Sequence, residues 1–337
     1  MKKNSHSKRT TQILIITSVL AIFIVGILIW YFSYKKPHDQ AIAKYTSVVS
    51  DYNALIPRYD SVAADFDAVI SDMNAATQKL DDVIVSAQNI IDNNEPPYDE
   101  ATLTHLENAI KKAEESKKEI PSPSEKVSEI SITENDKKSK TKDIEIKTDN
   151  IISEKKLFEK QILDLEKETT KLASEPLDYS SVITDIQEKQ KVFEDSVLVL
   201  KQITNPSEDF IIQRLKKISS ITDIQAVTED NDPNGHLNKQ GGYTASIYFA
   251  SSLVDQSDVY GTDTVDKGTD GGGCIEVYTT TSDAEKREVY LSSYDGTILD
   301  SGSHNVLGTI LIRTSSKLTA TQQKNLEKEI IEKFLEL

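Results

Sequence analysis

The sequence predicts a mainly helical chain that ends in an α+β domain. Three observations support this: an uncharged apolar run at Ile13–Phe32, a glycine-free stretch from Pro37 to Asn205, and eleven glycines between Gly235 and Gly308. Glycine is unfavourable inside helices and is favoured in turns. We therefore expect a cytoplasmic tail at 1–12, a transmembrane helix at 13–34, a helical coiled-coil stalk at 38–204 and an α+β extracellular domain at 205–337.

The apolar run sets the expected location of the protein. Ile13–Phe32 holds twenty residues without a charge, enough to cross the roughly 30 Å hydrocarbon core as a helix. Most of the flanking basic residues precede the run, which predicts a cytoplasmic N-terminus. Aromatic residues lie at the C-terminal end of the run, where a membrane interface is expected. The flanking residues are Lys2, Lys3, Lys8 and Arg9 before the run, and Trp30, Tyr31, Tyr34, Lys35 and Lys36 around its end.

A cleaved signal peptide is the alternative reading of this run. It needs an apolar core of about 7–15 residues and a small-residue cleavage site. Here the run is longer and ends in bulky side chains from Ile27 to Phe32. The sequence therefore favours an uncleaved signal anchor in the cell membrane, crossing once, with an extracellular C-terminus.

Charge and cysteine content narrow the class of partner. The net charge is −16, and the six basic residues among the first 36, with no acid beside them, leave −22 for the remainder. A surface of this overall sign will not hold nucleic acid or anionic lipid through net charge. Only one cysteine is present, Cys274, so no intramolecular disulfide can form. We expect no nucleic-acid partner.

The stalk is expected to contain four helices. From Tyr45 to Ile90, apolar or small residues recur at alternating spacings of three and four, which predicts a coiled coil that Pro57 kinks but does not end. Further helices are expected at about 99–119, 124–174 and 179–203, although residues 134–150 are charged enough to fray. Short breaks favour antiparallel packing within one chain. A homodimer through the stalk buries the same seam, so both arrangements stay open.

The C-terminal region alternates between two periodicities. Asn205-Pro206-Ser207-Glu208 is typical of a helix start, and Thr319 is typical of a cap on a last helix. The apolar pattern between these helices predicts four strands and one further helix, so the order of the whole domain is αβββαβα. The expected strands are 223–228, 243–249, 274–278 and a central strand at 306–312, with a helix from Ser282 to about Asp295 before the last strand.

Glycine-rich blocks in this region carry a resemblance to a known group of proteins. The blocks are Asn231–Gly235 with Gly241-Gly242-Tyr243, Lys267–Gly273, and Ser301–His304 with Gly308-Thr309 and Ile312–Ser315. Over about Thr222 to Leu326 they resemble uncharacterised, single-pass, membrane-anchored surface proteins of Gram-positive bacteria, some labelled extracellular-matrix-binding-like. The resemblance implies a cell-surface location and a domain type, and it implies no catalytic residue.

One loop matches the opening of a calcium-binding motif. Asp230, Asp232 and Asn234 precede Gly235 at the spacing of the first ligands of a calcium loop. The twelfth position is Gly241, where a bidentate Glu would stand, and Pro233 lies inside the loop. Calcium is the only cofactor that the sequence suggests. The alternative is a turn rich in Asn and Asp that joins two strands.

Two further features deserve a chemical reading. The stretch Asp255–Gly273 holds five aspartates and five glycines, so a lid over a ligand and a solvated loop are both open. Cys274 with His304 or His236 has the residue types of a thiol nucleophile and its base. A lone cysteine at the start of a strand is more often a small buried residue.

The leading expectation is a non-catalytic membrane protein that presents an α+β interaction domain on a coiled-coil stalk. Such a domain implies a protein or envelope partner. The first alternative is a structural scaffold, or a subunit of a cell-envelope complex, that acts through the stalk. The second alternative is a cell-envelope enzyme that uses Cys274 and His304.

Overall fold

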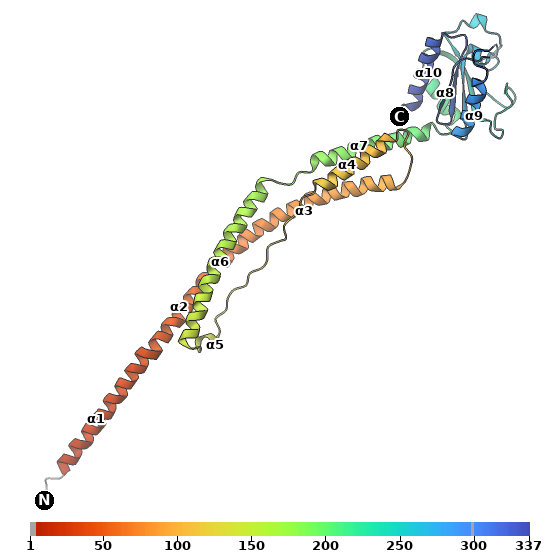
Figure 1. Ribbon diagram of the computed structural model, residues 1–337. Coiled ribbons are helices and arrows are strands. Elements are labelled where there is room, and N and C mark those ends of the chain that lie inside the picture. The colour runs from red at the N-terminus through yellow and green to blue at the C-terminus, as the bar shows by residue number, and fades with distance from the viewer. Residues whose placement is uncertain (1–4, 298–299) are drawn as a thin grey trace. The chain divides into compact units, whose positions relative to one another are not determined.

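The computed structural model describes residues 5–297 and 300–337 of the chain. The protein is mostly helical and ends in a domain built on an antiparallel sheet, as expected (Figure 1). It divides into two compact units, each of which is described by itself. Unit 1 comprises Met1–Lys79 and Lys117–Tyr179, and unit 2 comprises Leu80–Ser116 and Ser180–Leu337.

Unit 1 begins with an apolar helix that has no protein neighbour along most of its length. Helix α1 (Ser5–Trp30) continues into the π-helical turn η1 (Tyr31–Lys35) and then into α2 (Lys36–Asn53). The large apolar side chains of α1, among them Ile22 and Phe23, are exposed. Within the described part of the chain, one helix is long and apolar enough to cross a membrane, and it contains α1.

A break separates α2 from α3 (Ile56–Asp92), although Pro57 was expected only to kink a continuous helix. Pro57 stands in the first turn of α3, and its nitrogen has no hydrogen to donate to the preceding turn. Ala54 and Leu55 leave the regular helix here, and their amides bond to Ser50 and Tyr52 carbonyls. The Ala54 backbone stays in the helical region, so the proline interrupts the helix for two residues, at the place where a kink was expected.

Three short apolar cores lie along unit 1. Helix α6 (Thr141–Ser174) packs along α2, and Tyr45 and Val49 of α2 are buried with Ile144 of α6. Further along, Tyr59 of α3 packs on Phe158, with ring centroids 5.3 Å apart. A single helical turn, α5 (Glu134–Lys137), precedes α6, so most of the charged stretch 134–150 is helical.

Residues 117–133 are not helical, and we call this segment the strap. The helix expected from Ser124 is therefore wrong in its first part, because residues 124–133 lie in the strap and α6 begins only at Thr141. Side chains of the helices satisfy the backbone of the strap instead. Asn53 donates to the Ile130 carbonyl and accepts from the Ile130 amide, both at 2.9 Å, and Asp67 accepts from the Ser124 amide at 2.8 Å.

The helical part of unit 2 contains the end of α3, α4 (Ala101–Ser116) and α7 (Ser180–Gln202). Helices α4 and α7 pack against each other, and their buried residues include Leu106 and Ile186. The turn that leads into α4 is tied to α7, because the Tyr98 amide donates to the Ser196 carbonyl at 3.0 Å. The Asp99 amide donates to the Ser196 hydroxyl at 2.8 Å.

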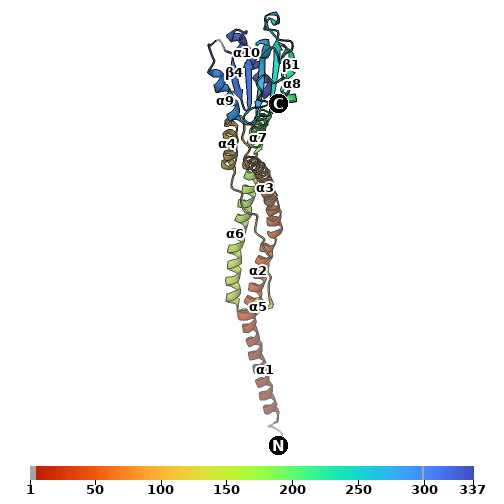
Figure 2. The same cartoon turned by 90° about the vertical axis from the view of Figure 1, so that its right-hand side faces the viewer.

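The C-terminal part of unit 2 is a sheet of five antiparallel strands between two layers of helices. The strand order is β1-β2-β3-β5-β4, so β1 and β4 form the two edges (Figure 2). Helices α8 and α10 cover one face with an apolar core, and α9 covers the other. The elements are α8 (Glu208–Leu215), β1 (Ile221–Ala226), β2 (Tyr243–Ser251), β3 (Gly272–Tyr278), α9 (Thr281–Ser292), β4 (His304–Leu307), β5 (Ile310–Thr314) and α10 (Ala320–Leu335).

The expected central strand at 306–312 is a hairpin. Leu307 pairs with Ile310 across a turn made by Gly308 and Thr309, so the observed order is αβββαββα. Gly308 has a φ of +60°, which favours glycine, and a Cβ there would lie 2.6 Å from the Ile203 carbonyl oxygen. The apolar run from Val306 to Ile312 hid this turn from a reading of periodicity.

The end of α7 enters the core of the domain. Ile203 follows the last residue of α7 and is fully buried among the residues between the sheet and α8 and α10. The Thr309 amide donates to the Ile203 carbonyl at 3.1 Å, and Gln202 donates to the Phe334 carbonyl at 2.7 Å. Stalk helix and domain therefore share one hydrophobic core.

Candidate functional site

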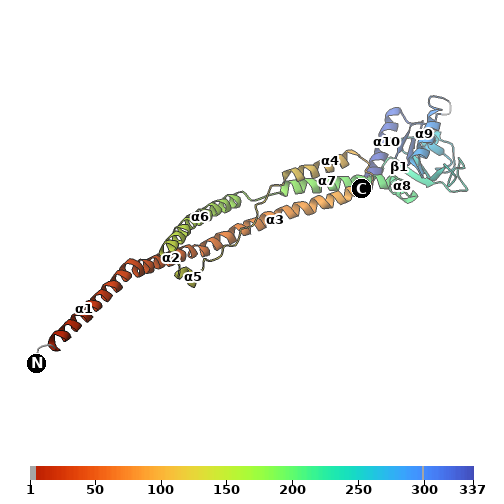
Figure 3. The ribbon, with the colours of Figure 1, turned by 60° about the horizontal axis from the view of Figure 1, so that its bottom comes forward.

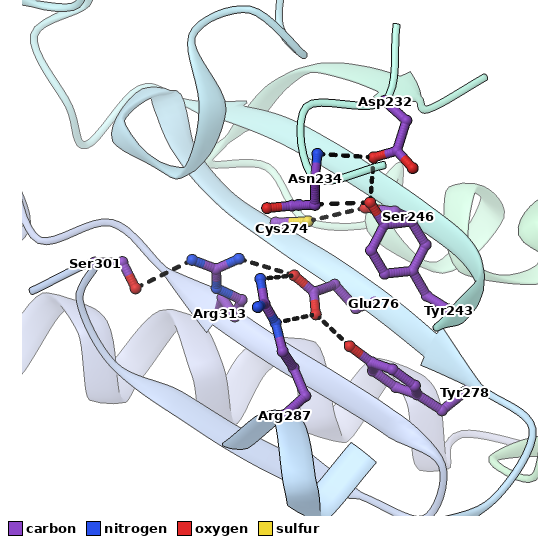
Figure 4. Close-up of polar contacts among 10 residues, drawn as sticks. All are labelled: Asp232, Asn234, Tyr243, Ser246, Cys274, Glu276, Tyr278, Arg287, Ser301 and Arg313. Atoms are coloured by element: carbon purple, nitrogen blue, oxygen red, sulfur yellow. Dashed lines mark hydrogen bonds and ion pairs between the residues drawn. The ribbon is translucent and has the colours of Figure 1, made fainter. Parts of the chain in front are cut away.

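The loop that resembles a calcium motif is organised around Asp232. Its carboxylate accepts hydrogen bonds from the Asn234 amide at 3.0 Å, the Leu237 amide at 2.8 Å and the Tyr243 hydroxyl (Figure 4). Burial raises the pKa of Asp232, but the Tyr243 hydroxyl and the backbone amides outweigh burial and hold this pKa below its usual value. Asp232 thus closes a turn and ties it to the start of β2.

The other two candidate ligands do not share this environment. Asp230 is exposed, and Asn234 is partly buried, with its side-chain amide 3.5 Å from the Tyr243 hydroxyl. No group of three or more His, Cys, Asp or Glu side chains suited to a metal ion is found within residues 5–297 and 300–337. The geometry matches the Asx turn that was the alternative, and the calcium site stays a prediction.

The aspartate- and glycine-rich stretch Asp255–Gly273 is held against the sheet. Thr264 donates to Asp223 of β1, and the Val265 amide donates to the Gln225 side chain at 2.9 Å. At the end of this stretch another strand approaches closely, because a Cβ on Gly273 would lie 2.3 Å from the Arg313 carbonyl oxygen and 2.3 Å from the Phe249 ring. At the tip, Tyr260 is 97% exposed.

Cys274 lies in the middle of the sheet. Its thiol is fully buried, 3.4 Å from the Ser246 hydroxyl, and burial raises the pKa of the thiol to about 12. His304 stands two strands away in the same row, with Arg313 between them. Two strand spacings separate their backbones by roughly 10 Å, and His236 lies on the loop beside Tyr243. The structure brings none of these histidines into hydrogen-bond contact with Cys274.

His304 lines a polar hollow at the end of β4. Its Nε2 lies 3.1 Å from Asp295 and its Nδ1 lies 3.2 Å from Glu288 of α9. The imidazole therefore bonds the edge strand to the segment after α9, while Nδ1 lies beside Glu288 without a hydrogen bond. The hollow is lined by Asp295, Asp300, Gly302, Ser303, His304, Ser316, Leu318 and Gln323.

A buried charge cluster lies under α9, and the sequence reading missed it. Glu276 of β3 is fully buried and accepts from Arg313 of β5 at 2.8 Å and from Arg287 of α9 at 3.2 Å (Figure 4). The Tyr278 hydroxyl donates to the same carboxylate at 2.7 Å, and Arg313 also donates to Ser301 at 3.1 Å. The cluster joins β3, β5, α9 and the segment before β4.

The two arginines decide the ionisation of Glu276. Burial raises the pKa of this carboxyl, but the positive charges of Arg313 and Arg287 outweigh burial and lower the pKa below its usual value. The same contacts raise the pKa of Arg313 against the opposing effect of burial. The carboxylate is therefore ionised at neutral pH and acts as a fixed acceptor that aligns three elements.

The sequence of β3 contains a signal for this cluster, because successive side chains of a strand point to opposite faces of the sheet. Cys274, Glu276 and Tyr278 occupy one face, while Ile275 and Val277 face the apolar core. A Glu between two strand residues on a face that a helix covers requires a basic partner. Arg313 is the basic residue of the neighbouring apolar strand.

Comparisons of the chain with protein-family models, with curated proteins and with solved structures find no match.

Proposed function

We propose that this chain is a single-pass membrane protein that presents a non-catalytic α+β interaction domain on the outside of the cell. Helices of unit 1 and unit 2 form the stalk, with the expected coiled-coil seam between antiparallel helices. The resemblance of residues 222–326 to surface proteins of Gram-positive bacteria agrees with this function.

One observation carries the proposal: from Ile13 to Trp30, α1 carries no charge, and its large apolar side chains are exposed on all sides. A helix of this kind is stable when it is buried in a large core or in a membrane. Within the described chain no other element covers the middle of α1, so a bilayer is the environment that its surface fits. The basic residues before Ile13 favour a cytoplasmic N-terminus.

Thiol labelling tests the topology, because the natural cysteine is buried. In a Cys274→Ser background, a cysteine is placed either at Ser7 or at Lys324, an exposed residue of α10. A membrane-impermeant maleimide added to intact cells should label the Lys324 variant. The Ser7 variant should be labelled only after lysis. Equal labelling of both variants, or the reverse pattern, would overturn the topology.

A scaffold that acts through the stalk is the second candidate, and a groove in unit 2 favours it. Ile90 of α3 and Phe193, Val197 and Leu198 of α7 line this groove, beside the ion pair of Lys201 with Glu95 at 2.7 Å. Leu198 is 50% exposed.

Site-directed photo-crosslinking separates the two candidates. A benzophenone amino acid replaces Leu198 in the stalk groove or Tyr260 at the tip of the domain loop, both of which are exposed. Crosslinks to other envelope proteins from the Tyr260 position support presentation of the domain. Crosslinks from the Leu198 position alone support the scaffold and would overturn the leading proposal.

A further inference from the structure

Residues 134–142, which comprise α5, the turn after it and the start of α6, gather lysines in a strongly acidic protein. Lys137, Lys138, Lys140 and Lys142 stand within six residues, and all four are exposed. The chain after residue 36 carries −22 overall, so this concentration of positive charge departs from the rest of the exported part. We call residues 134–142 the lysine turn.

Most of the positive charge in the lysine turn is not neutralised by nearby acids. Lys137 pairs with Glu134 at 2.8 Å, and Asp136 pairs with Lys147 of α6. Among the residues that the structure describes, no carboxylate lies within ion-pair distance of Lys138, Lys140 or Lys142. Asp143, in the first turn of α6, follows Lys142 directly in the sequence and acts electrostatically on Lys147.

Contacts within unit 1 place the lysine turn next to the apolar helix. The His38 Nε2 atom of α2 lies 3.0 Å from the Ser139 carbonyl oxygen. Figure 3 shows α5 beside α2. His38 is six residues after Phe32, the last residue of the apolar run. The chain is helical throughout this interval, so the distance along the axis is about 9 Å at 1.5 Å per residue.

The lysine turn is held firmly in this position. Thr133 and Asp136 form a capping box at the start of α5, and hydrogen bonds from Lys147 and Thr133 hold the pKa of Asp136 well below its usual value. Behind the turn, Ile130 and Ile132 of the strap pack into the core around Tyr45. The lysines are therefore presented by a folded element and not by a loose loop.

We propose that the lysine turn binds the anionic phospholipid headgroups of the bilayer that α1 occupies. This rests on the proposed membrane anchoring of α1. A span that ends at Phe32 leaves Ser139 at headgroup depth, within about one Debye length (8 Å) of the lipid phosphates. Aromatic residues at the same level, Tyr31 and Tyr34, favour the interface.

The net charge of the exported part predicted no binding of anionic lipid, whereas the position of the lysine turn next to the membrane favours it. Repulsion between the acidic remainder and a surface is screened beyond a Debye length, while the lysines stand inside it. Each lysine near an anionic surface contributes about fivefold to binding, so three unpaired lysines give about a hundredfold at most. The covalent link through α1 keeps the lipid surface permanently within reach, which favours headgroups over a soluble polyanion.

Fluorescence quenching in nanodiscs tests the proposal on the full chain. Asn135, exposed on α5, is replaced by cysteine in the Cys274→Ser background and carries an environment-sensitive dye. Nanodiscs contain headgroup-spin-labelled lipid in phosphatidylcholine, with or without phosphatidylglycerol. Quenching should be stronger with phosphatidylglycerol, and about 1 M salt, which shortens the Debye length to about 3 Å, should remove the difference.

A matched pair of triple variants tests whether the lysines of the lysine turn cause the phosphatidylglycerol-dependent quenching. K138Q/K140Q/K142Q should abolish the phosphatidylglycerol-dependent quenching. K156Q/K160Q/K167Q removes the same charge from exposed positions of α6 that lie about 20–40 Å further along the helix, and it should leave the quenching unchanged. Far-ultraviolet circular dichroism checks that both variants fold.

Three outcomes would overturn the binding of headgroups by the lysine turn. Equal quenching with and without phosphatidylglycerol, or equal loss in both triple variants, would show that the lysine turn does not bind headgroups. If added polyphosphate binds equally well in nanodiscs of phosphatidylcholine alone and removes the difference, the turn recognises a soluble polyanion instead. Failure of the chain to enter nanodiscs would instead refute the membrane anchor, so the two failures are distinguishable.

Discussion

Truncating Ile203 to alanine should open the C-terminal domain, although this residue follows the last turn of a stalk helix. Ile203 is fully buried in the core between the sheet, α8 and α10. The change removes three carbon atoms, worth about 2.4 kcal/mol at 0.8 kcal/mol each, and the cavity left behind raises such costs to 2–5 kcal/mol. We expect a loss of about 3 kcal/mol.

Cys274 provides the assay, because it is the only thiol and is fully buried. A thiol reagent in excess modifies Cys274 only when the domain opens, so the labelling rate reports the opening equilibrium. A loss of about 3 kcal/mol corresponds to about a hundredfold faster labelling. The measurement uses the full chain in nanodiscs, without denaturant.

Leu198→Ala is the matched control on the same helix. Leu198 is half exposed, and its truncation should change the labelling rate by less than about threefold. If Ile203→Ala also changes the rate by less than threefold, the end of α7 does not contribute to the domain core. The shared core described above would then be refuted.

Three further predictions concern the sheet face under α9 and the loop beside it. Burial raises the pKa of Cys274 from about 9 to about 12, so its contribution to stability is complete below pH 9 and is lost as pH rises above that value. The buried tyrosines of the same face have raised pKa values too and add their own loss above about pH 10. Between about pH 9 and 10, near-ultraviolet circular dichroism should therefore show a loss of stability in the wild type and not in Cys274→Ala. Glu276→Gln removes the charge that buried Arg313 and partly buried Arg287 share and should cost about 3–5 kcal/mol, with faster Cys274 labelling. Glu285→Gln at an exposed position of α9 should leave the labelling rate unchanged. If the Asp230–Gly235 loop binds calcium, millimolar calcium should slow Cys274 labelling in the wild type and not in Asp232→Ala; no calcium response in the wild type would leave only the turn.

The elements with a strong local signal were predictable from the sequence. The apolar helix, the helical character of residues 38–116 and the caps Ser207 and Thr319 all follow from periodicity and from residue types that bond their own backbone. These signals are local, so the rest of the fold does not alter them. The resemblance to surface proteins, the homodimer and the calcium site stay predictions.

The strap and the β4–β5 turn depend on contacts that periodicity does not record. The strap is fixed by Asn53 and Asp67, which lie more than fifty residues away from the backbone groups they bind. Gly308 breaks an apolar run because the Ile203 carbonyl occupies the space that a side chain would need. Both features follow from tertiary packing, which a single sequence does not reveal.

The candidate sites also differ in whether they depend on neighbours in sequence or on tertiary packing. The turn geometry at Asp232 follows from its neighbours in sequence, and the sequence reading had included it as the alternative to calcium. The cluster at Glu276 brings together Arg287 and Arg313 from two other elements. Strand pairing and the placement of α9 had to be known before these partners could be named.

The junction at Ile203 determines how tension would pass through the protein. The Thr309 amide and the Asn205 amide, which donates to the Thr309 hydroxyl at 2.6 Å, fasten the end of α7 to the β4–β5 hairpin. Gln202 fastens the same helix end to α10. A partner that pulls on the sheet would therefore transmit force directly to α7, without first stretching a flexible linker. The domain cannot swivel freely on its helix, so a bound partner is held in a fixed orientation relative to α7.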